Sequence, residues 1–156
     1  MARRPRLRHD VEMNDSVLHL PDLAATEALA ARLAARLRRG DVVLLAGPLG
    51  AGKTAFARAL LRQLTGDLAL DVPSPTFTLV QQYETPRGLV HHFDLWRLAG
   101  PEALAELGWD DALRDIVLVE WPERLGTWRP EGAIGVTLAH DGEASRHATL
   151  NGWNGA

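Results

Sequence analysis

The segment that most constrains the fold of this chain covers residues 47–54 and reads GPLGAGKT. It matches the pattern G-x-x-x-x-G-K-[ST], in which a glycine-rich loop joins a buried strand to a helix. A short apolar run at residues 42–46 precedes it, and an amphipathic segment at residues 53–64 follows it. Glycines let such a loop curl around phosphate oxygens, and the N-terminus of the following helix adds partial positive charge. The motif in this context predicts a phosphate-binding P-loop.

Lys53 is the single lysine among the 17 basic residues of the chain, and all the others are arginines. Arginine carries a planar fork of five donors, which cannot replace a slim ammonium group inside a phosphate cradle. A lysine here can reach the β- and γ-phosphates of a nucleotide, and the hydroxyl group of Thr54 can ligate Mg²⁺. The alternative is a flexible glycine turn with a solvent-exposed lysine. The bias toward arginine elsewhere favours the functional interpretation.

Helical patterns are predicted in several parts of the chain. Leucines at four-residue spacing within residues 23–39 indicate an amphipathic helix that stops at Gly40. A second helix is predicted over residues 53–64 and ends before Gly66. A short helix is predicted over residues 101–108, where a proline opens it and a glycine closes it.

Strand-like patterns occupy much of the remaining sequence. Continuous apolar runs at residues 42–46 and 116–119 are typical of strands buried on both faces of a sheet. Further extended segments are predicted at residues 76–83, 89–95, 133–139 and 146–150, of which the last two form a hairpin. This alternation predicts an α/β P-loop NTPase fold, with a mainly parallel central sheet flanked by helices and antiparallel strands added at its edge.

The length of 156 residues suits one compact domain. We expect a flexible basic tail over residues 1–14, a single P-loop domain over residues 15–151 and a C-terminal tail over residues 152–156. The absence of cysteine excludes disulfides and thiolate metal sites, and the net charge of −3 does not favour a polyanionic partner. Neither a membrane span of about 18 apolar residues nor a signal peptide is recognisable. We therefore expect a cytoplasmic protein that does not contact a membrane.

Two acidic residues are candidates for the element that holds Mg²⁺ and orients the attacking water beside a P-loop. Glu120 ends the apolar run at residues 116–119, and Asp94 lies near the end of another extended segment. Carboxylates at the carboxyl ends of strands project toward the edge where open α/β sheets bind ligands. A solvated carboxylate or a capping residue is the alternative at each position.

Other polar and aromatic residues carry weaker signals. Ser74 and Thr76 follow the second predicted helix, where switch segments of P-loop proteins lie, although a plain turn is equally open. The pair His91 and His92 lacks further metal-type ligands at suitable spacing, so we interpret both as structural or supporting residues. Trp121 comes directly after the acidic strand end and can lie either near a nucleotide or in the core.

The P-loop occurs together with three further motifs, namely SPTFTLV at residues 74–80, HFDLWR at residues 92–97 and VEWPER at residues 119–124. In this order and spacing, the motifs resemble those of the TsaE family, bacterial ATPases of tRNA threonylcarbamoyladenosine biosynthesis. The resemblance covers residues 20–150. Trp96 stands where the family usually has tyrosine, which keeps an aromatic ring but removes the phenol hydroxyl group.

The resemblance implies a small ATPase that binds a threonylcarbamoyl-transferase subunit and its non-catalytic partner subunit. It would support formation of threonylcarbamoyladenosine next to the anticodon of tRNAs that read codons starting with A, with indirect or weak tRNA contact. ATP would be the substrate and Mg²⁺ the cofactor. The nucleotide would contact Leu23, Gly50, Ala51, Gly52, Lys53, Thr54 and Ala55. Thr54 and Glu120 would hold Mg²⁺, and hydrolysis would need Asp94.

These assignments give an expected mechanism with Lys53, Asp94 and Glu120 as the catalytic residues. Lys53 and backbone amides cradle the phosphates, while Asp94 positions or polarises the attacking water. Arg97 and Arg124 are candidates for an arginine finger in cis, but neither is clearly placed for that role by the sequence. A missing finger lowers turnover by roughly 10³–10⁵-fold. We therefore expect slow hydrolysis by the isolated protein and faster turnover with its partner.

Two other functions remain open from the sequence. A small-molecule P-loop kinase has a similar size and loop, but the sequence shows no arginine-rich lid between the motifs. A nucleotide-gated docking module would use ATP binding to order residues 74–83, with incidental hydrolysis. Substitution of Asp94 or Glu120 separates the module from the ATPase, because only the ATPase needs hydrolysis.

Overall fold

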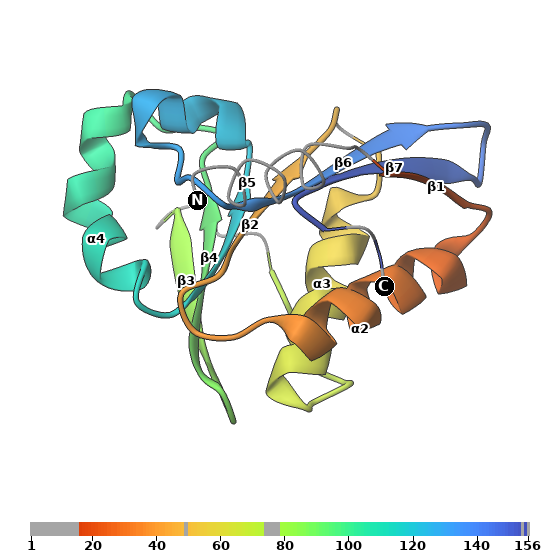
Figure 1. The fold of residues 1–156 in the computed structure, drawn as a ribbon, viewed down its shortest axis with the longest axis horizontal. Coiled ribbons are helices and arrows are strands. Elements are labelled where there is room, and N and C mark those ends of the chain that lie inside the picture. Colours follow the sequence, from red (N-terminus) through yellow and green to blue (C-terminus); the bar gives the residue numbers. More distant parts are fainter. Residues whose placement is uncertain (1–15, 49, 74–78, 154, 156) are drawn as a thin grey trace, which may run out of the picture.

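The computed structural model describes residues 16–48, 50–73, 79–153 and 155. Its strands are β1 (Ser16–Leu20), β2 (Val42–Ala46), β3 (Val80–Thr85), β4 (Gly88–Asp94), β5 (Ile116–Glu120), β6 (Ile134–His140) and β7 (Arg146–Asn151). They form one seven-stranded sheet in the order β1-β7-β6-β2-β5-β4-β3 (Figure 1). The tail predicted at residues 1–14 and the first part of the extended segment predicted at residues 76–83 lie outside the described residues.

The middle of the sheet is parallel and both of its edges are antiparallel. Strands β6, β2, β5 and β4 run parallel to one another, whereas β3 pairs antiparallel with β4 at one edge, and β7 with β6 and β1 with β7 pair antiparallel at the other. Every residue of β5 is buried, and β2 is buried up to the half-buried Ala46. A strand with helices on both faces is apolar on both sides, which explains the two continuous apolar runs. The predicted α/β fold with a mainly parallel sheet is confirmed.

Helices cover each face of the sheet (Figure 1). Their bounds are α2 (Leu23–Arg36) and α3 (Lys53–Thr65) on one face, and the 3-10 helix η1 (Pro101–Leu107), α4 (Trp109–Ala112) and the 3-10 helix η2 (Pro122–Trp128) on the other. The second face has its own core, in which the rings of Phe93 and Trp109 pack edge to face with centroids 5.1 Å apart. Within the described part of the chain, no helix has the length and apolar character needed to cross a bilayer.

Helix α2 ends at Arg36, earlier than the limit of residue 39 that the leucine spacing suggested. Leu37 is extended (φ −72°, ψ 142°) and buries its side chain to 2% exposure. Carbonyl oxygens at this end accept hydrogen bonds from the guanidinium of Arg87, so a tertiary contact replaces the next helical turn. Gly40 (φ +97°) therefore belongs to the turn into β2 and does not cap the helix. Helix α3 ends as predicted, at the left-handed Gly66.

Two peripheral parts of the fold differ from the expected organisation. Strand β1 was not predicted, because its five residues form an edge strand whose partner, β7, lies at the opposite end of the sequence. The segment expected as a C-terminal tail contributes Trp153 to the core on the α2 and α3 side of the sheet, where its side chain is 6% exposed. The first part of the expected tail thus takes part in packing through Trp153.

Truncation of this aromatic residue, Trp153→Ala, is expected to lower the free energy of unfolding by about 3–5 kcal/mol, because it leaves a large cavity in the core. Urea unfolding followed by circular dichroism measures the change. The control is Leu68→Ala, a surface position 67% exposed, which should change the unfolding free energy by less than about 0.5 kcal/mol. Equal stability of the two variants would contradict a packing role for residue 153.

Candidate functional site

The carboxyl ends of three adjacent parallel strands bring the predicted site residues to one edge of the sheet. The loop of residues 47–52 follows β2, Glu120 is the last residue of β5 and Asp94 is the last residue of β4. In register, Glu120 lies between Leu45 of β2 and Asp94 of β4. Parallel neighbours in register present their side chains to the same face. The two candidate carboxylates therefore lie beside each other and next to the P-loop.

The P-loop needs its glycines for two distinct reasons. A Cβ atom on Gly47 would lie 2.4 Å from the carbonyl oxygen of Leu138, so only glycine fits against β6. Gly52 has a left-handed backbone (φ +101°, ψ 11°) as the residue that precedes α3. Gly47 thereby lets the loop pass close to β6, and Gly52 lets α3 begin directly at the loop, so that the N-terminus of the helix lies at the site. Leu49 lies outside the described residues.

Lys53 is held inside the site by two contacts. Its ammonium nitrogen donates a hydrogen bond to the carbonyl oxygen of Gly47 at 2.5 Å, and it lies 3.5 Å from the centroid of the Trp121 ring. Burial lowers the pKa of the Lys53 ammonium, and this shift is opposed by the carboxylates of Glu120, Glu123 and Asp94. The residue is 6% exposed, so the ammonium is both largely desolvated and pre-positioned at the loop.

Trp121 has a left-handed backbone that is rare for a bulky residue (φ 60°, ψ 53°). Such a conformation costs about 1–3 kcal/mol and persists only where its surroundings hold it. Here the chain turns directly after Glu120, and the indole ring lies over Lys53. Trp96, 44% exposed, packs on the same indole with ring centroids 4.4 Å apart. Both features left open by the sequence occur together: the indole lies beside Lys53 at the P-loop, and it also packs against the core on the η1, α4 and η2 side of the sheet.

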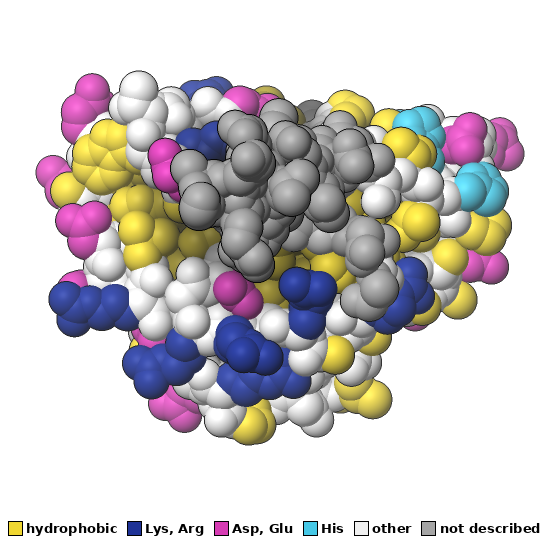
Figure 2. Space-filling view, viewed as in Figure 1, with side chains coloured by type: hydrophobic (Ala, Val, Ile, Leu, Met, Phe, Trp, Pro, Cys, Tyr) yellow, Lys and Arg dark blue, Asp and Glu magenta, His cyan; other side chains and the backbone are white. Residues whose placement is uncertain are grey.

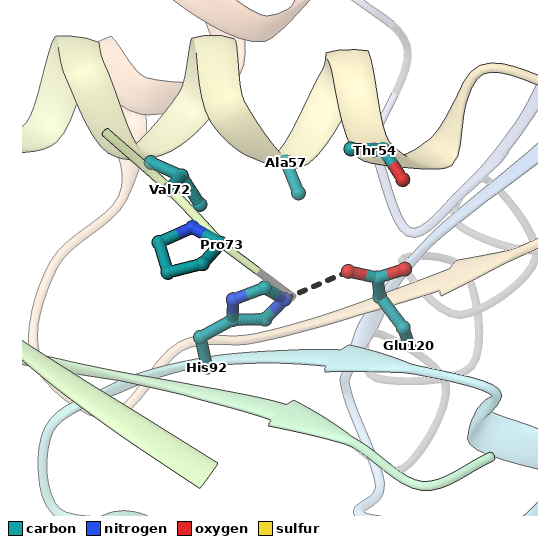
Figure 3. A pocket seen from close by; sticks show the side chains of 6 residues that line it. All are labelled: Thr54, Ala57, Val72, Pro73, His92 and Glu120. Atoms are coloured by element: carbon teal, nitrogen blue, oxygen red, sulfur yellow. Dashed lines mark hydrogen bonds and ion pairs between the residues drawn. The ribbon is translucent and has the colours of Figure 1, made fainter. Parts of the chain in front are cut away.

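Glu120 and Thr54 face each other across a small pocket (Figure 3). The pocket is lined by Thr54, Ala57, Val72, Pro73, His92 and Glu120. Its free space of about 10 Å³ is close to the minimum that a single water molecule or ion needs. Its polar lining consists of the hydroxyl group of Thr54, the carboxylate of Glu120 and the imidazole of His92, of which the first two carry hard oxygen donors.

His92 fixes the carboxylate of Glu120 in this pocket. The Nε2 atom of His92 lies 2.7 Å from Oε2 of Glu120, and both side chains are buried (Figure 3). The other ring nitrogen, Nδ1, is buried and has no hydrogen-bond partner among the described residues. His91 points to the other face of the sheet, where its Nε2 atom lies 2.9 Å from Oδ2 of Asp115. The two histidines thus have different surroundings: one supports Glu120, and the other links β4 to the start of β5.

The few oxygen donors at the pocket suit Mg²⁺, which needs few protein ligands. They do not suit a metal ion whose ligands all come from protein side chains. No group of three or more His, Asp or Glu side chains that could hold a metal ion occurs among the described residues. Mg²⁺ commonly uses one or two protein oxygens, phosphate oxygens and water. Thr54 and Glu120 could supply the two protein oxygens, and the remaining positions of such an ion would be left to phosphate oxygens and water.

The other predicted site residues differ in their hydrogen bonds and in their exposure to solvent. The backbone N–H of Asp94 bonds to the carbonyl oxygen of Leu79 at 2.9 Å, and its Oδ1 accepts the N–H of Trp96 at 3.2 Å. Leu23 is the first residue of α2, and its side chain is 53% exposed. Ala51 is buried, Gly50 is exposed and Ala55 is partly exposed, whereas the possible switch residues Ser74 and Thr76 lie outside the described residues.

Arginines near the site were only partly anticipated. Arg97 is exposed, and Arg124 donates a hydrogen bond to the carbonyl oxygen of Leu98 at 3.1 Å. Arg146, which no sequence motif singled out, reaches the P-loop from β7. No local signal could have revealed it, because the contact joins residues more than 90 positions apart in the chain.

The sheet order, the glycine-rich loop before α3 and the lysine at the helix start define a nucleotide-binding protein with a P-loop fold. A family model described as "Threonylcarbamoyl adenosine biosynthesis protein TsaE" matches residues 20–148. The chain belongs to the TsaE family.

Individual relatives agree with this assignment. The tRNA threonylcarbamoyladenosine biosynthesis protein TsaE of Rickettsia felis is 44% identical over 63% of this chain and 57% of its own length, and that of Rickettsia bellii is 38% identical over 82% and 89%. The match therefore spans little more than half of the Rickettsia felis protein. The crystal structure of Bacillus subtilis YdiB superimposes with a TM-score of 0.69 at 26% identity, covering 88% of this chain and 84% of that one.

Proposed function

We propose that the chain binds and hydrolyses MgATP, and that this activity supports the synthesis of threonylcarbamoyladenosine on tRNA in the cytoplasm. The observation that carries the proposal is the meeting of Lys53, Thr54, Asp94 and Glu120 at one sheet edge beside the P-loop. The names of the relatives, tRNA threonylcarbamoyladenosine biosynthesis proteins, support the pathway. Each residue type matches a task in phosphoryl transfer, in which catalysis rests mainly on positioning and charge stabilisation.

The proposed chemistry assigns one role to each side chain. Lys53 leaves the Gly47 carbonyl oxygen and binds the β- and γ-phosphate oxygens, where the full charge of its ammonium is favoured. Thr54 and Glu120 would hold Mg²⁺, which neutralises charge on the phosphates when bound. Asp94 accepts a hydrogen bond from the attacking water and orients it toward the γ-phosphorus atom. The attack breaks the bond between the γ-phosphorus and the oxygen that bridges it to the β-phosphate, and the products are ADP, inorganic phosphate and a proton released to solvent.

The proposed partners are a threonylcarbamoyl-transferase subunit and its non-catalytic partner subunit. Arg124 is bonded to a carbonyl oxygen of the chain itself, so we expect stabilisation of the γ-phosphate charge to come from a partner. Such a contribution is typically about 10³–10⁵-fold in rate. Contact with tRNA is expected to be weak or indirect, since the net charge is −3 and the Lys and Arg side chains in the lower part of the face in Figure 2 have Asp and Glu side chains near them.

Reconstitution with the transferase complex, tRNA and ATP tests this function. Lys53→Ala should lower the yield of modified tRNA under multiple-turnover conditions about 100-fold, because the variant loses the main phosphate contact. The control Arg114→Ala removes an exposed charge just before β5, at the opposite edge of the sheet from the P-loop, and should retain the wild-type yield. Equal yields from Lys53→Ala and the wild type would remove the ATPase from the proposed pathway.

The same system separates the proposal from its alternatives. Asp94→Asn should bind MgATP but fail to support repeated modification. Retained modification without phosphate release would favour a nucleotide-gated docking module. ADP release that depends on an added small-molecule acceptor and yields a phosphorylated product would favour a kinase.

A further inference from the structure

Arg146 connects the edge of the sheet to the P-loop. It is the first residue of β7, and its half-buried guanidinium donates from Nε to the carbonyl oxygen of Ala51 at 3.1 Å and from Nη2 to that of Gly50 at 3.3 Å. Its Nη1 atom donates to the carbonyl oxygens of Ser145 at 3.0 Å and Glu143 at 3.3 Å. The bonds from Nη1 to its own hairpin fix the side chain, and Nε and Nη2 remain to bond the loop.

The geometry of the peptide bond gives these contacts a consequence inside the loop. A trans peptide is planar, so its C=O and N–H groups point in opposite directions. The carbonyl of Gly50 shares a peptide with the N–H of Ala51, and the carbonyl of Ala51 shares one with the N–H of Gly52. Holding both carbonyl oxygens outward on a guanidinium therefore turns both N–H groups to the opposite side.

The interior of the loop shows the result of this orientation. The N–H of Ala51 points across the loop and donates to the carbonyl oxygen of Pro48 at 3.2 Å. Backbone N–H groups directed into such a loop are the donors that cradle phosphate oxygens, so a bound phosphate would replace the Pro48 carbonyl oxygen as the acceptor for the N–H of Ala51. The side chain of Ala51 is fully buried, which further restricts rotation of these peptides.

The charge of Arg146 acts in the same direction. Its hydrogen-bond partners among the described residues are all neutral carbonyl oxygens, and it takes part in none of the ion pairs between them. A cation without a carboxylate partner increases the positive potential at the loop, where a nucleotide would bring several negative charges. Donation to the carbonyl oxygens also polarises the two peptides and strengthens their N–H groups as donors.

We propose that Arg146 is a positioning residue for nucleotide binding: its guanidinium holds the carbonyl oxygens of Gly50 and Ala51 outward, so that the N–H groups of Ala51 and Gly52 are pre-organised to bind phosphate. This inference rests on the proposed function, since it assumes that the loop binds a nucleotide. The guanidinium acts through the loop backbone and does not touch the reacting atoms. The β6–β7 hairpin thereby becomes a part of the nucleotide site.

Calorimetric titration of the purified protein with MgADP and MgATP tests the inference. Arg146→Gln should weaken both affinities at least about 10-fold, the loss expected for hydrogen bonds that involve a charged group. Arg146→Lys keeps the charge but lacks the fork that spans two carbonyl oxygens, so it should restore the affinity only in part. The control Arg114→Gln makes the same charge change far from the loop and should bind as the wild type does.

Nuclear magnetic resonance of the backbone amides distinguishes a positioning role of Arg146 from a purely structural one. In the wild type, the amide resonances of Ala51 and Gly52 should shift strongly on addition of MgADP. In Arg146→Gln these two shifts should be lost or reduced at saturating nucleotide, while the amides of β5 keep their wild-type positions and show that the fold is intact.

The outcomes separate this inference from the proposed function. If the wild type binds neither nucleotide, the proposed function is wrong, and the inference that rests on it is overturned with it. If the wild type binds while Arg146→Gln binds equally well with unchanged amide shifts, only the positioning role is overturned. Full affinity in Arg146→Lys would likewise overturn the role of the fork, because charge alone would then suffice. If Arg146→Gln does not fold, Arg146→Lys decides between these results.

Discussion

Lys53→Arg is expected to lower the affinity for MgATP about 100-fold although the net charge of the chain is unchanged. The ammonium of Lys53 lies between the carbonyl oxygen of Gly47 and the ring of Trp121, at 2.5 Å and 3.5 Å, and the residue is 6% exposed. A planar guanidinium is wider than an ammonium and cannot approach both groups in this space. It would have to displace the indole or the loop, so shape rather than charge should limit binding. Calorimetric titration of the isolated protein measures the change.

A matched exchange at another site provides the control. Arg114→Lys swaps the same two residue types at an exposed position away from the P-loop and should leave MgATP affinity within about twofold of wild type. Lys53→Ala should bind at least as weakly as Lys53→Arg. Normal affinity in Lys53→Arg would contradict the argument that the only lysine of the chain stands where arginine cannot.

The central part of the site could be predicted because its signals are local. Each signal can be recognised within a window of about ten residues: the loop motif, the apolar run before it, and the polar residues that end β4 and β5. Parallel pairing of β4, β5 and β2 then places the ends of these strands at the same edge of the sheet, and Asp94 and Glu120 with them. Short range in the sequence and regular strand geometry together made this part of the structure predictable.

The parts that escaped prediction depend on contacts between distant segments. Arg146 and strand β1 have no local pattern that places them, because β7 brings the arginine to the P-loop and supplies the partner of β1. The end of α2 is set by Arg87 from the β3–β4 turn, and a sequence periodicity cannot report such a bond. Trp153 likewise follows the last strand and looks like a tail until the core that receives it is known.

The same distinction applies to the partner of Glu120. His92 was interpreted as structural or supporting because neighbouring residues offered no metal-binding pattern, and this was as far as the sequence could go. The structure pairs its Nε2 atom with Oε2 of Glu120, which leaves Oε1 as the carboxylate oxygen without this histidine contact. Thr54 lies across the pocket from this carboxylate (Figure 3). The pairing therefore limits rotation of the carboxylate at the position proposed for Mg²⁺.

Glu120→Gln is the substitution expected to reduce hydrolysis most selectively, by about 100–1,000-fold in the reconstituted complex. Glutamine has nearly the same shape, and its amide oxygen can still accept a hydrogen bond from His92, so the fold and the pocket should be retained. The variant lacks the negative charge that makes a carboxylate a strong ligand for a hard divalent cation. Binding of MgATP should weaken much less than hydrolysis, because Lys53 and the loop amides still contact the phosphates.

The dependence of phosphate release on Mg²⁺ concentration distinguishes this role from a general loss of charge. In Glu120→Gln the Mg²⁺ midpoint should rise well above that of the wild type. Glu123→Gln removes the same charge from an exposed residue that also acts electrostatically on Lys53, and its midpoint should not change. If both variants shifted the midpoint equally, the effect would come from the field around Lys53, and Glu120 would not be a metal ligand. A shift confined to Glu120→Gln would instead locate the cation between the end of β5 and the start of α3, the two elements that the P-loop fold brings together at this edge.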